Sequence, residues 1–308
     1  MAHLDDCNFV VTGATGWLGR ASLGALEARL GDAFAARVFA YATKDGQTSL
    51  QSGRIVRYGA LNAISELPPA RYAVLHCAFL GKERVADMPL GDYVQLNAAI
   101  SEQVCDAARR IKAQALFVPS SGAVYAKDRM LETDIGKNPY GVMKLKDEAR
   151  FTRLAEELQC PLLVARVFNV AGPYMNKTTS YALGSILEDV AHHRPVRIRA
   201  AQRIIRSYSH VMDLMELVLA MLDEGAANPV WFDTAGEREI EVGELARLVL
   251  DLLGHKAGAI ERPALDSTLP DNRYVGDGTA MRMLAARHDI TLRPLSAQIA
   301  DTASFLAG

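Results

Sequence analysis

The chain has 308 residues, of which 50% are hydrophobic and 23% charged, a composition typical of a folded protein with one large domain or two closely joined ones. Its 34 basic and 36 acidic side chains give a formal net charge of -2, whereas general nucleic-acid-binding proteins usually carry a basic excess. No apolar run approaches the roughly 20 residues that cross a membrane, so we expect neither nucleic acid nor a membrane as a partner.

The cysteines are scattered along the chain, with no CxxC pair, and no histidine stands at metal-ligand spacing. We therefore expect reduced thiols and no metal site. The segment 1–7 carries acidic side chains and no basic stretch followed by an apolar one. It therefore does not resemble a secretion signal, and we expect a cytoplasmic protein.

The first half of the chain alternates short apolar or β-branched runs with longer helical patterns. We expect strands at 8–12, 37–42, 53–58, 73–77, 115–119 and 162–167. We expect helices at 17–30, 93–112 and 140–158. This alternation predicts an α/β fold with a doubly wound, parallel, Rossmann-type sheet and right-handed crossovers.

After Asn169 the rhythm loosens. We expect a loop at 171–181, helices at 182–193, 211–222, 242–253 and 297–306, and strands at 196–200 and 230–232. No internal repeat and no low-complexity linker separates these segments. The expected division is a larger domain of 1–168, to which 208–235 return, and a smaller C-terminal lobe of 169–207 and 236–308.

A glycine-rich string, Thr12-Gly13-Ala14-Thr15-Gly16-Trp17-Leu18-Gly19, follows the first expected strand and opens the first expected helix. Glycine is needed where a turn is tight, where the backbone approaches a pyrophosphate and where a helix packs on a strand. The N–H groups and the positive dipole end at the start of a helix favour anionic phosphates. A glycine-rich turn alone is weak evidence, but this strand–turn–helix context predicts a dinucleotide site.

The glycines are spaced GxxGxxG, and in this the string resembles the fingerprint of the extended short-chain dehydrogenase/reductases. That family contains nucleotide-sugar epimerases, dehydratases and 4-keto reductases, together with dihydroflavonol-reductase-like enzymes. The resemblance implies that the larger domain binds a nicotinamide dinucleotide and that the smaller lobe binds the substrate. The cofactor contacts that it implies are Gly13, Thr15, Gly16, Trp17, Leu18, Gly19, Thr43, Lys44, Cys77, Ala78, Tyr140 and Lys144.

The end of the second expected strand bears on the choice between NAD and NADP. An Asp or Glu usually holds the ribose 2′-hydroxyl of NAD there, but Ala42 replaces it in this chain. Lys44 can meet a 2′-phosphate, as a basic residue does in NADP-using relatives, or it is a solvated lysine beside Asp45. The segment 59–61 also departs from the family, which commonly places an adenine-contacting Asp there. We expect NAD or NADP, with a slight preference for NADP.

Tyr140 and Lys144 lie four residues apart at the start of an expected helix, so both side chains share one face. Tyrosine has an ordinary pKa of about 10, too high for a base near neutrality. A lysine cation and an oxidised nicotinamide nearby both favour the phenolate and lower that pKa. The phenol can then exchange a proton with a substrate hydroxyl or carbonyl. YxxxK is common by chance, so the neighbouring motifs decide its meaning.

The string Pro119-Ser120-Ser121-Gly122-Ala123-Val124-Tyr125 strongly resembles the serine motif of the family. The resemblance makes Ser121 the catalytic serine, which holds the substrate oxygen beside Tyr140, and leaves Ser120 to face the cofactor or the core. Asn97 matches the asparagine that completes the family's active-site tetrad. The implied catalytic set is Ser121, Tyr140, Lys144 and Asn97.

Gly122 and Ala123 stand where the sugar-nucleotide dehydratases carry Asp-Glu, and UDP-glucuronate decarboxylases tend to carry a Glu in place of Ala123. Without those titratable groups, dehydration and decarboxylation are disfavoured, whereas epimerisation and ketone reduction remain. Asn169 lies in a string similar to the family's RxxNxxGP, and Arg206 in one similar to its RxYxHVxD. The resemblance makes both contacts of the substrate diphosphate, for which guanidinium is suited by its bidentate geometry. The implied substrate-binding residues are Ser121, Asn169 and Arg206.

The resemblance therefore predicts an NAD(P)-dependent epimerase that acts on a nucleotide-activated sugar through a transient 4-keto intermediate. One alternative is an NADPH-dependent reductase of a keto-sugar or another carbonyl compound. An alternative of another class is a catalytically silent dinucleotide-binding scaffold. Relatives commonly dimerise through the helices that correspond to 93–112 and 140–158, so we expect a homodimer. Ala98, Ile100, Cys105 and Ala108 can supply part of an apolar dimer face, or can equally pack on the sheet.

Overall fold

The computed structural model describes residues 4–225, 229–255 and 258–308. Contacts within the chain divide it into two compact units. The first unit is the part of the chain up to Val167 together with Met215–Phe232, and the second is Phe168–Leu214 together with Asp233–Gly308. The roles expected of these parts, dinucleotide binding and substrate binding, stay predictions.

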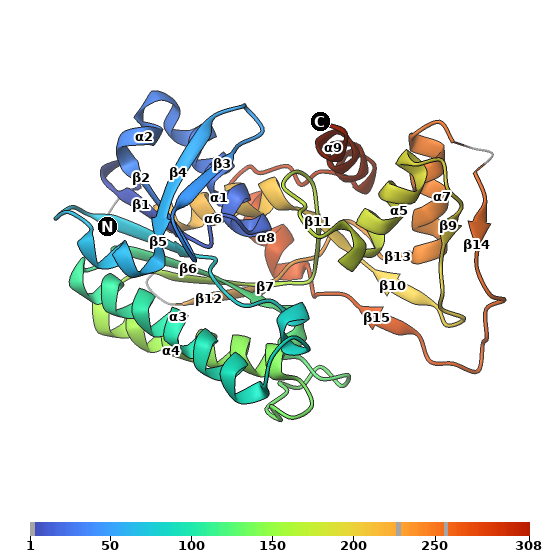
Figure 1. Ribbon diagram of the computed structural model, residues 1–308, viewed down its shortest axis with the longest axis horizontal. Coiled ribbons are helices and arrows are strands. Elements are labelled where there is room, and N and C mark those ends of the chain that lie inside the picture. Colours follow the sequence, from blue (N-terminus) through green and yellow to red (C-terminus); the bar gives the residue numbers. More distant parts are fainter. Residues whose placement is uncertain (1–3, 226–228, 256–257) are drawn as a thin grey trace. The chain divides into compact units, whose positions relative to one another are not determined.

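The first unit is built on a sheet in which the described residues form eight strands in the order β12-β7-β6-β5-β1-β2-β4-β3 (Figure 1). The pairings from β7 across to β4 are parallel, and the edge pair β3–β4 is antiparallel. The prediction of a doubly wound, mostly parallel sheet is therefore confirmed. The strands are β1 (Asn8–Thr12), β2 (Val38–Ala42), β3 (Gly46–Ser49), β4 (Ile55–Ala60), β5 (Tyr72–His76), β6 (Ala115–Ser121), β7 (Leu162–Val167) and β12 (Val230–Asp233).

Helices cover both faces of this sheet. Helices α3 (Leu90–Arg110) and α4 (Pro139–Leu158) lie side by side on one face, and α1 (Trp17–Leu30) lies on the other with α6 (Val211–Glu224) (Figure 1). The Ser22 hydroxyl of α1 lies 3.1 Å from the Met215 sulfur of α6. The shorter helices are α2 (Phe34–Arg37), η1 (Leu4–Asp6), η2 (Gly31–Ala33), η3 (Leu61–Glu66), η4 (Lys82–Val85) and η5 (Gly122–Val124).

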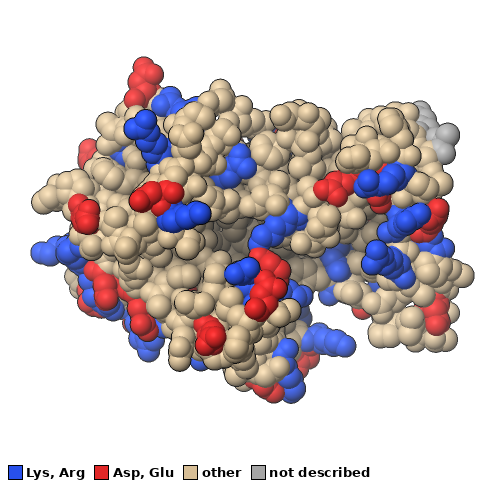
Figure 2. Space-filling view, in the orientation of Figure 1, with Lys and Arg blue, Asp and Glu red and all other residues tan. Residues whose placement is uncertain are grey.

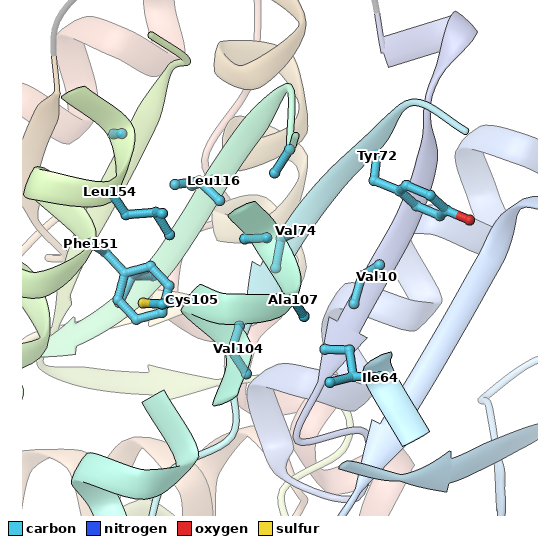
Figure 3. Close-up of a cluster of buried hydrophobic side chains, with 14 of the residues drawn as sticks. Val10, Ile64, Tyr72, Val74, Val104, Cys105, Ala107, Leu116, Phe151 and Leu154 are labelled. Carbon is cyan, nitrogen blue, oxygen red and sulfur yellow. The ribbon is translucent and has the colours of Figure 1, made fainter. Parts of the chain in front are cut away.

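The core of the first unit lies between the sheet and the α3–α4 layer. Val10, Val74 and Leu116 come from three neighbouring strands and belong to one buried cluster with Phe151 and Leu154 of α4, in which Val10 lies beside Ile64 (Figure 3). These side chains are at most 2% exposed, and burying one of them fully contributes about 1.5–3 kcal/mol. The chain segments that carry Val10, Val74 and Leu116 are continuous β-branched and apolar runs, which is typical of strands in a sheet whose two faces are both covered.

Most of the residues that were candidates for a dimer face take part in this core. Cys105 is 2% exposed and Ala108 is fully buried, and both belong to the cluster, against which Ile100 also packs. Cys105, Ala108 and Ile100 therefore pack in this core, whereas Ala98 is partly buried and is not part of the cluster. On the visible face, acidic and basic side chains alternate over the outer surface of α3 and α4 (Figure 2).

The second unit combines short strands with four longer helices in its described residues. It contains β8 (Asn169–Ala171) paired in parallel with β11 (Tyr208–His210), the sheet β13-β10-β15, and the pair β14–β9. Its core joins α5, α7 and α9 through Leu183, Leu187, Leu245, Val249 and Ile299. The remaining bounds are η6 (Thr178–Ser180), α5 (Ala182–Ala191), β9 (Val196–Arg197), β10 (Ile204–Arg206), β13 (Ile240–Glu241), α7 (Val242–Leu252), β14 (Ile260–Glu261), β15 (Asn272–Tyr274), α8 (Thr279–Arg287) and α9 (Leu295–Ala307).

Several predicted bounds were wrong. The strand expected at 196–200 is two residues long, and the expected loop at 171–181 contains the turn η6. The edge strand β3 and the helix α8 were not expected. β3 reads Gly-Gln-Thr-Ser and pairs only with β4, so it has no apolar alternation to reveal it. In the part of the chain that the structure describes, no helix has the length and apolar character needed to cross a membrane.

Candidate active site

The glycine string forms the turn between β1 and α1. Gly13 has a φ of +70°, and a Cβ there would lie 2.6 Å from the carbonyl carbon of Cys77. A Cβ on Gly19 would lie 2.0 Å from the Gly13 carbonyl oxygen. Both glycines are therefore required by the fold itself, because the turn packs tightly on the end of β5 and on its own helix.

Gly16 differs from these two glycines. It is the N-cap of α1, with an ordinary φ of −77° and no side-chain cap, and a Cβ there would come no closer than 3.3 Å to another group. Neither backbone strain nor a severe clash explains a glycine at this position. A missing side chain at the helix start does fit the close approach of a phosphate to the backbone. Of the other predicted contacts, Thr15 is exposed and Trp17 is buried, at 7% exposure.

Thr12 joins the ends of β1 and β5. Its hydroxyl lies 2.9 Å from Nδ1 of His76 and accepts a hydrogen bond from the Ala78 amide at 3.2 Å. Burial, and secondarily the cations of Lys144 and Arg150, lower the pKa of His76 to about 3, so its ring is neutral near neutral pH. The contacts place the predicted cofactor residues Cys77 and Ala78 against the glycine turn.

Thr43 and Lys44 are exposed just after β2. The Asp45 carboxylate accepts a hydrogen bond from the Ala60 amide at 2.6 Å, which ties the turn after β2 to the end of β4. Asp45 is thus bonded to backbone, and Lys44 forms no ion pair with any carboxylate in the described ranges. This leaves the Lys44 ammonium available to an anion in solution.

The first turn of α4 is fixed to the segment that follows β6. The Asn138 side chain caps the helix by accepting from the Gly141 amide at 3.0 Å, and donates to the Ala123 carbonyl at 2.6 Å. A Cβ on Gly141 would lie 2.0 Å from that same carbonyl oxygen. The glycine after Tyr140 therefore lets α4 begin directly against the end of the serine strand.

Lys144 lies one turn further into α4 and is 7% exposed. Its ammonium donates to the Pro119 carbonyl at 2.9 Å and lies 3.8 Å from the centroid of the Phe79 ring. The same ring meets the Tyr140 ring edge to face, with centroids 5.9 Å apart. Burial lowers the pKa of Lys144, while the nearby Asp147, Cys77 and Glu148 oppose that shift.

The two serines at the end of β6 have different surroundings. Ser120 donates to Glu148, which also forms an ion pair with Arg166, and Arg166 donates to the Tyr125 hydroxyl at 2.6 Å. Ser120 is therefore part of a buried polar network. Ser121, at 5% exposure, caps η5 by accepting from the Ala123 amide at 3.1 Å.

Asn97 is fully buried in α3. Its oxygen accepts from the Leu80 amide at 2.8 Å, and its nitrogen donates to the Tyr93 carbonyl at 3.1 Å. Asn97 thus fixes the loop that follows β5 at Leu80, the residue next to Phe79. Its expected place in the catalytic set stays a prediction.

In the second unit, Arg206 is bound through one nitrogen to the carbonyls of Ile205 and Asn272, each at 2.8 Å. It forms no ion pair with a carboxylate of the described residues, and burial lowers its pKa. A half-buried guanidinium without a counter-charge suits an anionic ligand. Asn169 donates to the carbonyls of Ser207, at 3.3 Å, and Tyr274, at 3.1 Å, which ties β8 to its neighbours.

Phe79, Asp147 and Glu148 were not among the predicted residues. Asp147 and Glu148 follow Lys144 by three and four positions on the same helix face, a spacing that could have revealed them. Phe79 stands in a loop, and no periodic pattern marks it. Within the described residues, no group of three His, Cys, Asp or Glu side chains is arranged to hold a metal ion.

The chain is similar to known proteins in sequence and in fold. The model of the NAD dependent epimerase/dehydratase family matches residues 9–232. A UDP-2-acetamido-2,6-beta-L-arabino-hexul-4-ose reductase of Pseudomonas aeruginosa is 22% identical over 238 residues, covering 77% of this chain and 55% of that protein. The chain thus spans about half the length of this curated relative.

Two solved structures are similar over nearly their whole length. A UDP-N-acetylglucosamine 4-epimerase of Methanobrevibacter ruminantium, solved with UDP-N-acetylmuramic acid, has a TM-score of 0.77 at 17% identity and 98% coverage of both chains. A UDP-glucuronic acid 4-epimerase of Bacillus cereus, solved with NAD, has a TM-score of 0.68 at 16% identity, covering 97% of this chain and 96% of the other. At these identities the likeness shows the shared fold.

Proposed function

The chain belongs to the NAD dependent epimerase/dehydratase family, and from this premise we propose that it is an NAD(P)-dependent epimerase of a nucleotide-activated sugar. The observation that carries the proposal is the Tyr140–Phe79–Lys144 arrangement at the start of α4. It couples a phenol to a buried cation beside the end of the serine strand. The names of the matched reductase and of the two epimerase structures, all acting on UDP-sugars, support this substrate class.

The residues present fit a dinucleotide. The backbone N–H groups at the start of α1, with Gly16 leaving their approach open, would hold its pyrophosphate, and Lys144 would bind the nicotinamide ribose. A bound dinucleotide would supply the hydride acceptor and donor that epimerisation requires. The neighbouring structure solved with NAD supports NAD, whereas the unpaired Lys44 supports NADP, so we propose either.

The chain's own residues supply the proton transfer. The Ser121 hydroxyl orients the sugar oxygen, and the Tyr140 phenolate removes the proton from the 4-hydroxyl. Lys144, held by Pro119 and Phe79, stabilises the phenolate through its positive charge. As the ketone forms and is reduced again, Tyr140 returns the proton, so the epimerase completes its cycle without net proton uptake. Arg206 and Asn169 are our candidates for the substrate diphosphate.

A reductase of a keto-sugar is the second candidate, and the name of the matched Pseudomonas reductase favours it. The two reactions differ in their use of the cofactor. Incubation of the protein with excess NADH or NADPH and UDP-4-keto-sugars should consume at most one equivalent of reduced nicotinamide per protein if the protein is an epimerase that retains its cofactor. A loss of reduced-nicotinamide absorbance stoichiometric with the keto-sugar would identify a reductase instead. NMR of UDP-sugars incubated with protein and NAD should show the 4-epimer.

We also propose a homodimer that pairs α3 and α4 with those of a second copy. The outer surface of these helices carries Leu96, 48% exposed, and the exposed ion pair between Arg109 and Glu157. The pairing would therefore bury mixed polar and apolar surface rather than a purely apolar one. A dimer in sedimentation velocity at micromolar protein that dissociates in the Leu96→Arg variant is expected. A monomeric wild-type protein under those conditions would rule out the dimer.

A further inference from the structure

Phe79 lies at a central position in the candidate active site. Its ring is in contact with both Lys144 and Tyr140. The Lys144 ammonium faces the ring at 3.8 Å from its centroid, and the Tyr140 ring meets it at an angle of 77°. The contact therefore joins the two members of the YxxxK pair through a residue outside that motif.

The Lys144 cation needs this partner because few others are available. Only one oxygen, the Pro119 carbonyl, accepts a hydrogen bond from it, and none of the described carboxylates forms an ion pair with it. Glu148 is paired with Arg166 and accepts from Ser120, and one oxygen of Asp147 is paired with Arg150. An ammonium removed from water is stabilised by the negative face of an aromatic ring.

The backbone beside Phe79 is held at Leu80 from two directions. The Leu80 amide donates to Asn97, and the Leu80 carbonyl accepts from the Tyr93 hydroxyl at 2.8 Å. Both partners are buried in α3, so the loop cannot shift without breaking hydrogen bonds inside the helix layer. The ring is thus presented by a fixed backbone, which is what a positioning residue requires.

We propose that Phe79 is a positioning residue whose ring holds the Lys144 ammonium and the Tyr140 ring in the arrangement that proton transfer uses. The role of Phe79 in proton transfer rests on the proposed function, whereas the contacts of its ring with Lys144 and Tyr140 do not. The charged and titratable groups that face Lys144 are Asp147 and Glu148 on its own helix, His76 at the end of β5 and Cys77 in the loop after β5. None of them replaces the ring, since none bonds to the ammonium.

The first test needs neither cofactor nor substrate. Lysine side-chain NMR of the cofactor-free protein would compare wild type with Phe79→Leu, which keeps an apolar group but loses the ring, and with Phe79→Tyr, which keeps the ring. Lys144→Met assigns the signal, and the exposed Lys146 is the control. We expect the ring-current shift of Lys144 to vanish in Phe79→Leu and to survive in Phe79→Tyr. The Lys144 titration midpoint should fall by about 0.5–1.5 pH units in Phe79→Leu only.

An unchanged Lys144 signal and midpoint in Phe79→Leu would overturn the proposal. Phe79→Met serves the same purpose if circular dichroism shows that Phe79→Leu does not fold.

In turnover, the alkaline limb of the pH–rate profile should move to lower pH in Phe79→Leu and return in Phe79→Tyr, because Lys144 loses its proton earlier. If the NMR changes occur but the wild type converts no nucleotide sugar, the contact between the Phe79 ring and Lys144 stands and the proposed function fails. If the wild type converts a nucleotide sugar and the pH–rate profiles of all variants coincide, the Phe79 ring has no part in catalysis.

Discussion

Glu148 of α4 and Arg166 of β7 form a two-bond ion pair, with nitrogen–oxygen distances of 2.7 and 3.0 Å, directly behind Ser120. Their side chains are 5% and 17% exposed. The pair fixes the helix that carries Tyr140 and Lys144 to the strand next to β6. Its partners Ser120 and Tyr125 both come from the serine motif.

Removal of one member of this pair should be costly. Glu148→Ala leaves the Arg166 guanidinium largely buried without its counter-charge, and we expect it to reduce the free energy of unfolding by about 3–5 kcal/mol. Glu261→Ala is the matched control, because its pair with Arg197 is exposed and worth less than about 1 kcal/mol. Urea unfolding at neutral pH measures both. Equal effects of the two variants would contradict the structural weight given to Glu148.

Substitutions at Gly16 and Gly13 should have different effects, one on cofactor binding and the other on the stability of the fold. Gly16→Asp should leave the protein folded, since no severe clash opposes a side chain there, but abolish dinucleotide binding because a carboxylate opposes the pyrophosphate. Gly13→Ala should destabilise the fold itself, since its φ is +70° and its Cβ would meet the Cys77 backbone. Calorimetry with NAD and NADP and thermal unfolding distinguish the two effects. Unchanged cofactor affinity in Gly16→Asp would remove the basis of the functional proposal.

Lys44 tests the cofactor preference. If its ammonium meets a 2′-phosphate, Lys44→Ala should weaken NADP binding by about 1–3 kcal/mol and leave NAD binding nearly unchanged. Lys146→Ala, which alters an exposed lysine on α4, is the control. Equal losses for NAD and NADP, or no loss, would mean that Lys44 is a surface residue without a part in recognition.

Tyr140→Phe separates chemistry from binding. The change removes one oxygen and keeps the ring that packs against Phe79, so the fold should be preserved. Turnover should fall by about 10²–10⁴-fold, the usual contribution of a general acid–base, with cofactor and sugar-nucleotide affinity altered only a few-fold. Lys144→Met should reduce turnover further, since it removes both the charge and the ribose contact. Near-normal turnover of Tyr140→Phe would show the assigned mechanism to be wrong.

The lowered pKa of the buried His76 makes the stability of the protein depend on pH. Its pKa is lowered to about 3 in the folded protein, so below its ordinary value of 6.5 the unfolded chain binds more protons. Stability is therefore unaffected above that value and is lost as the pH falls toward about 3. At about pH 5 the expected loss is about 2 kcal/mol relative to neutral pH. The same pH series of urea unfolding on His76→Gln should have a shallower slope, and parallel slopes would contradict the burial of a neutral ring.

The sequence predicted those features that repeat along the chain or match a motif. Val10, Val74 and Leu116 lie in apolar runs, and their strands were placed to within a few residues because the parallel sheet buries both faces. The Gly13–Gly19 turn and the Tyr140–Lys144 spacing were likewise readable. Phe79 was not, because its importance depends on how the loop after β5 is folded back by Asn97. The strands of the second unit are two or three residues long, too short to show a period.

The position of β12 has a consequence for how the chain can be made. It is the outermost strand beside β7, yet 62 residues of chain separate Val167 from Val230. A nascent chain or a truncated fragment that ends before Val230 has all the other strands of this sheet but presents β7 with an open edge. Such an edge invites pairing with another chain, so we expect fragments that end near Leu214 to aggregate even though they contain Ser121, Tyr140 and Lys144. Expression trials that shorten this protein should keep the returning segment Met215–Phe232 attached.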